Sequence, residues 1–347
     1  MPGMRKRCLI FLLDLMMMHM LSAVHAQQAE KPDLWNTGAV GQVLPMDEMQ
    51  VVEHGVSLLG ERVWVDLFPG FGVVRSVFRF SNRTDQPIRL KVGYPVSGWF
   101  AVGSVALAHF DDARSLIVSA DGKQVITQPA AGSSNGHDPN PFSYEVWEQT
   151  FAADTLTTIT VESVVPTQLS RLAAGDRFST GNAFGVSLMG ADAWDGPIGQ
   201  LQVLVRLNGG LMLADIRGLS PDSAFTGNLG HLQVDKMDLE PGAADNLLIW
   251  YNGAPADYPF EKKVTPMLKA LRASMDTFPV TAFNDPGFQP IRRNDFDMAA
   301  GGLTLAGVLY FIMFSTPWVI LIGFVVLMLR DKRKRRTAQT TEDRTDI

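Results

Sequence analysis

The chain has 347 residues, a formal net charge of −6, 46% apolar residues and 19% charged residues. This composition excludes a disordered chain, because enough apolar side chains are present to build a core. The length allows one large domain or two ordinary ones.

The first 26 residues have the parts of an export signal. Three cations at positions 5–7 precede an apolar stretch, and small residues lead up to Ala26. This order is typical of a cleaved secretory signal. An uncleaved membrane helix is the alternative, but the apolar stretch is short and Asp14 interrupts it. We expect cleavage after Ala26, which makes residues 27–48 the N-terminal segment of the mature chain.

Residues 49–254 contain short segments in which apolar and polar residues alternate. In "ERVWVDLF" the apolar Val63, Val65 and Leu67 alternate with other side chains, and "VVRSVFRF", "PIRLKVGYPV" and "GQLQVLVRL" behave alike. This period predicts half-buried antiparallel strands, and clusters such as "SNRTDQP" predict the turns between them. We therefore expect an all-β ectodomain, an antiparallel β-sandwich that is either one large sandwich or two stacked ones, with the loop 129–142 as the seam.

The pattern changes in residues 255–302. "YPFEKKVTPMLKALRASM" places Val264, Leu268, Leu271 and Met275 at helical spacing. It predicts a short amphipathic helix packed on its own domain. The proline-rich remainder predicts a juxtamembrane stalk.

Residues 303–329 predict one C-terminal transmembrane helix. The 27 residues carry no charge, and sixteen are Leu, Ile, Val or Phe. As a helix they would extend ~40 Å, longer than the ~30 Å hydrocarbon core of a bilayer. A buried core helix is the alternative, but it would rarely run so far without a polar face.

The tail 330–347 begins with a cluster of cations that we expect at the membrane interface: Arg330, Lys332, Arg333, Lys334, Arg335 and Arg336. The positive-inside rule places this tail in the cytoplasm and the N-terminal body outside. The expected partner at this end of the chain is the lipid bilayer.

Charge and cysteine content indicate the compartment. Residues 1–26 carry +2 and residues 330–347 carry +3, which leaves −11 for residues 27–329. An acidic body is unsuited to nucleic acid, so no nucleic-acid partner is expected. The one cysteine, Cys8, lies in the signal, so the mature body has no disulfide. This fits a periplasmic domain of a bacterial plasma (inner) membrane protein better than a small eukaryotic ectodomain.

Candidate catalytic residues are sparse. No histidine has the spacing of a zinc ligand, and no phosphate-binding loop follows a strand, so neither a metal nor a cofactor is expected. In "SYEVWEQTF", Glu145 and Glu148 lie three residues apart, which on a strand sends them to opposite faces. We therefore favour a protein that is not an enzyme. The alternative is an envelope hydrolase acting on glycan or peptide, with His137 near these two glutamates.

Two groups of residues could bind a ligand or a partner. His137 and Asp138 lie in a loop rich in Gly, Asn and Pro. Aromatic residues that could form a platform for glycan or peptide are Trp99, Phe100, Trp147 and Trp194. Core packing is the favoured interpretation for the aromatic residues and a solvated turn is the favoured one for the loop, so binding is the alternative in both cases.

Several segments resemble an uncharacterised bacterial family of exported β-rich domains. The matching elements are a Glu-His pair at 53–54, an F-x-F-x-N strand at 78–82, a G-[FY]-P end at 93–95, and the turn "WDGPI" at 194–198. The match covers roughly residues 49–253. Because the family has no assigned function, the resemblance implies a β-rich fold and an exported compartment, and it implies no catalytic residues.

Together these observations predict a single-pass, membrane-anchored protein of the bacterial cell envelope whose exported β-sandwich acts as a binding or assembly module. An envelope protein is the expected partner. The oligomeric state is left open.

Overall fold

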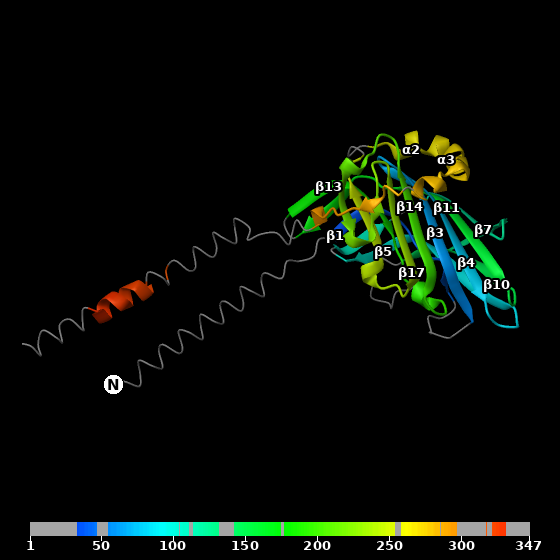
Figure 1. Cartoon of the computed structure of the whole chain (residues 1–347), viewed down its shortest axis with the longest axis horizontal. Coiled ribbons are helices and arrows are strands. Elements are labelled where there is room, and N and C mark those ends of the chain that lie inside the picture. The colour runs from blue at the N-terminus through cyan, green and yellow to red at the C-terminus, as the bar shows by residue number, and fades with distance from the viewer. Residues whose placement is uncertain are drawn as a thin grey trace, which may run out of the picture. The chain divides into compact units, whose positions relative to one another are not determined.

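Two β-sheets make up most of the described chain (Figure 1). The computed structural model describes residues 33–46, 55–103, 105–110, 114–131, 142–174, 177–253, 258–284, 286–296, 317 and 321–330. The chain divides into two compact units, one up to Ala299 and a second from Ala300 to Ile347. The all-β prediction for the body is confirmed.

The first sheet has ten strands. In order across the sheet they are β15 (Ile216–Ser220), β18 (Leu247–Tyr251), β13 (Arg177–Val186), β12 (Ser170–Ala174), β1 (Asp33–Val40), β6 (Val105–Phe110), β5 (Ile88–Val102), β10 (Ser143–Phe151) and β9 (Gln128–Ala131), with β2 (Leu44–Pro45) also beside β5.

The second sheet has nine strands. In order they are β19 (Gln289–Pro290), β16 (Thr226–Gly227), β17 (His231–Leu239), β14 (Ile198–Leu207), β3 (Val56–Phe68), β4 (Phe71–Asn82), β11 (Leu156–Pro166), β7 (Arg114–Ala120) and β8 (Lys123–Val125). Both sheets take strands from both halves of the chain, and β9 pairs with β10 across the expected seam at 129–142. The body is therefore one sandwich.

The prediction of purely antiparallel sheets is wrong, because both sheets are mixed. β14 runs parallel to β3, with Val203 opposite Val63. β1 runs parallel to both β6 and β13. Alternation in a sequence shows which face of a strand is buried, but it contains no information about the direction of the neighbouring strand.

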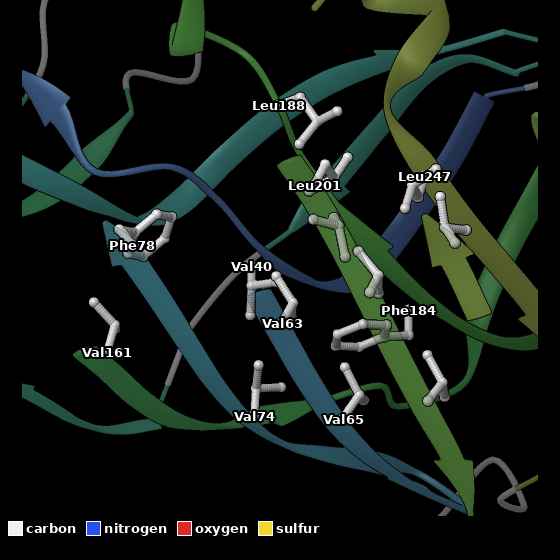
Figure 2. Packing of buried hydrophobic residues seen from close by; sticks show 14 of the residues in the cluster. Val40, Val63, Val65, Val74, Phe78, Val161, Phe184, Leu188, Leu201 and Leu247 are labelled. Carbon is white, nitrogen blue, oxygen red and sulfur yellow. The ribbon is translucent and has the colours of Figure 1, made fainter. Parts of the chain in front are cut away.

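The main core lies between the apolar faces of the two sheets. Figure 2 shows Val63 and Val65 of β3 and Val74 of β4 pointing toward Phe184 of β13. Val63 and Val65 have no exposed surface, as their alternation predicted. The packing is close, because a side chain at Gly72 would lie 3.3 Å from the Phe184 ring.

A second, smaller core lies on the far side of β18. Leu247 and Ile249 face the main core, whereas Leu248 and Trp250 join a cluster that contains Leu34 of β1 and residues of β5, β6 and β12. All of these strands belong to the first sheet. Leu248 and Trp250 point away from the main core and still share a cluster with residues of β5 and β6, so the sheet curls and both faces of β18 are buried.

A helical segment covers one end of the outer face of the second sheet, as Figure 1 shows for α2 and α3. It consists of α2 (Phe260–Lys263), η5 (Thr265–Met267), α3 (Leu268–Ser274), η6 (Met275–Thr277) and η7 (Val280–Asn284). We call this segment, 258–284, the helical cover. The short turns η1 (Ala191–Ala193), η2 (Leu213–Asp215), η3 (Asp222–Ala224) and η4 (Ala243–Asp245) lie in loops.

The helical cover is the amphipathic element expected in 255–302. Its apolar side chains pack on Phe71, Val73 and Leu204 of the second sheet. Arg75 of β4 fastens it: Nε donates to Glu162 Oε1 at 2.6 Å, and one terminal nitrogen donates to Asp276 Oδ1 at 2.7 Å. The cover is thus held to the sheet both by apolar packing and by the hydrogen bonds of Arg75.

Beneath the cover, Asp66 is buried on the face that alternation had predicted to be polar. Both of its carboxylate oxygens accept hydrogen bonds of 2.6 Å from Arg206, and Asn208 donates another at 3.0 Å. The Arg206 guanidinium also lies 5.5 Å from the centre of the Phe278 ring. Burial of this carboxylate is tolerated because a bidentate partner is present.

The described part of the C-terminal unit is Pro317 and the helical residues 321–330. Among the residues that the structure describes, no helix combines the length and apolar character needed to cross a membrane. The rest of the predicted span 303–329 lies outside the described residues, as does the expected signal 1–26.

We expect Phe278→Ala to destabilise the body by about 3 kcal/mol, because a buried ring would be removed. Phe278 is 8% exposed and stacks on Trp64 with ring centres 6.0 Å apart. Urea unfolding measures the loss, and hydrogen exchange should rise in residues 260–284. Met267→Ala, at a position 48% exposed in the same segment, is the control. Equal stability of the two variants would contradict this role for the cover.

Candidate functional site

The outer face of the curled first sheet carries a row of aromatic and cationic side chains. The row exists because its members alternate along the strands with residues of the second core. Trp35 follows the buried Leu34, and Trp99 precedes the buried Phe100. We call the following set the aromatic row: Phe178 of β13, Arg171 of β12, Trp35 of β1, His109 of β6, Trp99 of β5, and Phe142 and Tyr144 at the start of β10.

Contacts link one half of the row across three strands. The Arg171 guanidinium lies 4.6 Å from the centre of the Phe178 ring, the geometry of a cation–π contact. Arg171 is also the register partner of Trp35. Side chains of directly paired residues share a face, so these three are neighbours.

The other half continues from Trp35. Its ring centre is 6.2 Å from that of His109, which is the register partner of Trp99. Trp99 lies 5.9 Å from Phe142, and Phe142 lies 5.9 Å from Tyr144. The row thus crosses β13, β12, β1, β6, β5 and β10, six neighbouring strands.

The row is accessible along its length. Phe178 is 62% exposed and Trp35 is 46% exposed, with Leu107 of β6 beside them at 38%. Trp99, His109, Phe142 and Tyr144 are half-buried. Partial burial raises the pKa of Tyr144 and keeps its phenol neutral near pH 7. Aromatic side chains held on a rigid sheet offer large contact area with little loss of conformational entropy on binding.

The three tryptophan residues and one phenylalanine residue that the sequence suggested as an aromatic platform do not lie together in the structure. Trp99 lies in the aromatic row, but Phe100, Trp147 and Trp194 are at most 5% exposed. Trp194 donates from Nε1 to the carbonyl oxygen of Val43 at 2.8 Å and packs 4.6 Å from the Phe80 ring. These three side chains contribute to the cores, and no shared platform of the four forms.

Most of the remaining sequence-based candidates fall outside the described residues. His137 and Asp138 are outside the described residues, and so are the tail cations Lys332, Arg333, Lys334, Arg335 and Arg336. Arg330 ends the helical residues 321–330. The roles expected for these residues stay predictions.

The two glutamates considered for hydrolysis do not approach one another. Glu148 is exposed and pairs with Arg89 at 3.1 Å. Glu145 pairs in register with Tyr94, a residue of the main core, so it faces the opposite side of β10. Among the described residues, no three His, Cys, Asp or Glu side chains gather in a way that could hold a metal ion.

Sequence reasoning missed Trp35, His109, Arg171 and Phe178 as members of a site. They come from three separate stretches of the chain, around residues 35, 109 and 171–178. The available signal is an aromatic residue at an outward position of an alternating strand, such as Trp35 next to Leu34. The order of the strands in the sheet decides which of these outward aromatic residues become neighbours.

A buried polar group lies in the main core, near the bulge that separates Leu58 from Gly60 in β3. The bulge adds one residue and turns Glu61 inward, where it is 2% exposed. Gln42 Nε2 donates to Glu61 Oε2 at 2.7 Å. Burial raises the pKa of Glu61 to about 8, and the Gln42 hydrogen bond opposes the shift only in part. Glu61 is therefore mainly protonated at pH 7.

No family model and no curated protein sequence matches the chain, which agrees with its resemblance to a family of unknown function. Among solved structures, a candidate nutrient binding protein from Legionella pneumophila is 14% identical, with a TM-score of 0.44 and coverage of 68% of this chain and 77% of that one. An M1 zinc metallopeptidase from Deinococcus radiodurans is 9% identical, with a TM-score of 0.27 and coverage of 57% and 42%. Yeast LTA4 hydrolase in complex with bestatin is 8% identical, with a TM-score of 0.32 and coverage of 69% and 38%. This chain thus spans less than half of each enzyme, and likenesses this slight carry no activity across.

We expect the stability of the body to fall as pH rises from about 4.5 to about 8, because over this range the folded state holds a proton on Glu61 that the unfolded state has lost. Glu61→Gln should remove this dependence and be more stable at pH 7 by ~2–3 kcal/mol. Urea unfolding at several pH values measures both effects.

Glu148→Gln is the matched control, because Glu148 is an exposed carboxylate. Parallel pH profiles for the wild type and Glu61→Gln would show that Glu61 titrates normally.

Proposed function

We propose that this chain is a binding module of the bacterial cell envelope and that another envelope protein docks across the aromatic row. The observation that carries the proposal is the continuity of the row over six neighbouring strands, with its largest side chains at the surface. Exposed apolar patches of this kind mark interaction sites in soluble domains.

The residue types of the row favour a protein partner. Trp, Tyr and Arg supply most of the binding energy in protein–protein interfaces, where they lie near the centre and lose water on binding. The row has Trp35 at its middle, with Arg171 and His109 on either side. A glycan stacked on the same rings is the second ligand class that such a surface accommodates, and covalent crosslinking separates the two.

The proposed location rests on the sequence of the C-terminal part. The uncharged run 303–329 is long enough to span a bilayer, and six cations follow within residues 330–336. We propose that this run anchors the chain in the plasma membrane, with the β-sandwich in the periplasm and the tail in the cytoplasm. The helical state of residues 321–330 is compatible with this anchor.

A photoreactive amino acid placed at Leu107 or Thr180, which border the row, should form covalent products with an envelope protein in intact cells. The same group at Met237, which is 64% exposed on the second sheet, is the control and should form no such product. Gel analysis with mass spectrometry identifies the product. Attachment of a glycan in place of a protein would assign the row to the second ligand class, and equal products from all three positions would refute a specific surface.

Trp35→Ala should reduce the yield of these products at least about tenfold, because truncation of a central interface tryptophan removes a large part of the binding energy. Its fold should be retained, since the side chain is 46% exposed. Leu156→Ala, at a position 52% exposed on the second sheet, is the control variant. Unchanged yield in Trp35→Ala would move the binding surface elsewhere.

Protease added to intact spheroplasts should digest residues 27–302 and leave an epitope in residues 337–347 uncut, because only the body would lie outside the membrane. Immunoblots against both ends measure the outcome, and lysed spheroplasts are the control. Digestion of the tail with a protected body would reverse the proposed orientation.

A further inference from the structure

A small pocket of about 140 Å³ opens on the outer face of the second sheet, on the opposite sheet from the aromatic row. Its lining includes Gly60, Arg62, Trp64, Arg79, Gln200 and Gln202. Liquid water occupies ~30 Å³ per molecule, so the pocket has room for a few non-hydrogen atoms.

The alternation of side chains along β3 and β4 and the register between these strands place Arg62 and Arg79 close together on the outer face. Val63 of β3 and Phe78 of β4 face the core, so their neighbours Arg62 and Arg79 face outward. Gly60 is the register partner of Arg79, and Val77 is that of Arg62, which makes the two arginines diagonal neighbours on adjacent strands. Their side chains therefore reach one another's vicinity.

Both guanidinium groups are available to a ligand. Arg62 and Arg79 are exposed, and neither makes an ion pair within the part of the chain that the structure describes. By contrast, Arg75 and Arg206 on the same face are both held by carboxylates. A guanidinium is a planar fork of donors that matches the oxygens of a carboxylate or a phosphate.

The rest of the lining adds further polar groups. Trp64 stacks on Phe278 of the helical cover, and its buried Nε1 has no acceptor among the described residues. Gln200 and Gln202 of β14 each place Nε2 near Asp235, at 3.3 and 3.4 Å. Their Oε1 atoms then remain to accept hydrogen bonds.

We propose that this pocket binds a small oxyanion that carries a hydroxyl group beside its charged end. The oxyanion lies between Arg62 and Arg79, and the hydroxyl donates to a glutamine carbonyl oxygen of β14. This site goes beyond the proposed docking function: it is on the other sheet and takes a ligand of different chemistry.

Isothermal titration calorimetry on the full-length protein tests the site, with sodium lactate, sodium acetate and sodium phosphate as probes and sodium chloride as the matched salt. Lactate and acetate share the carboxylate, but only lactate carries the adjacent alcohol, and phosphate represents the other class of oxyanion. Saturable binding is expected, with lactate tighter than acetate by about three- to tenfold, the gain of one neutral hydrogen bond. If phosphate binds more tightly than lactate and acetate do, the charged group of the natural ligand is a phosphoryl group.

Arg62→Gln and Arg79→Gln should each weaken binding at least about tenfold, since each removes charged hydrogen bonds. Arg83→Gln, an exposed arginine in the turn after β4, is the matched control for the lost charge. Gln202→Leu should remove the preference for lactate over acetate while it retains acetate binding. Circular dichroism of each variant verifies the fold.

A second readout is the indole fluorescence of Trp64. Lactate should change the emission of the wild type, and this change should be absent in Trp64→Phe. The proposal is overturned if none of the oxyanions gives saturable heat, if Arg83→Gln weakens binding as much as the pocket variants do, or if lactate and acetate bind equally.

Discussion

The burial of one apolar face of each sheet against the other is the interaction on which this structure depends. Residues such as Val63, Val65 and Phe78 lose all contact with water in this layer, and each fully buried aliphatic or aromatic side chain contributes roughly 1.5–3 kcal/mol. Because side chains alternate along a strand, this burial also decides which residues face outward. Both candidate surfaces are consequences of it.

The two outward faces are used differently. On the second sheet, the helical cover occupies one end. There Arg75 donates a hydrogen bond to Asp276 of the cover, and Arg206 pairs with the buried Asp66 beneath it. The uncovered part next to Trp64 keeps two arginines without carboxylate partners among the described residues, and a pocket forms there. On the first sheet, curling buries one side of β18 in a second core and leaves the aromatic row on the outside.

Glu61 shows that the core itself is not uniformly apolar. The bulge in β3 turns this carboxyl inward, next to Gln42, on the same strand that lines the pocket. Its burial favours the neutral form, which costs less than burying a charge. A polar group of this kind tends to specify one arrangement of a core, since alternative packings would leave it without a partner.

Local periodicity is enough to predict the all-β class, the buried faces of the strands and the amphipathic segment. Val63, Val65 and Phe78 are buried as their alternation indicates, and Val264 packs in the cover as its helical spacing indicates. The parallel pairing of β14 with β3 and the inward turn of Glu61 at a bulge could not be read locally. Which outward residues become neighbours depends on the order of the strands in the folded sheets. Trp35 lies beside Arg171 and His109, and Arg62 lines one pocket with Gln202, because the sheets join strands that are distant along the chain, and the packing of the whole chain sets that order.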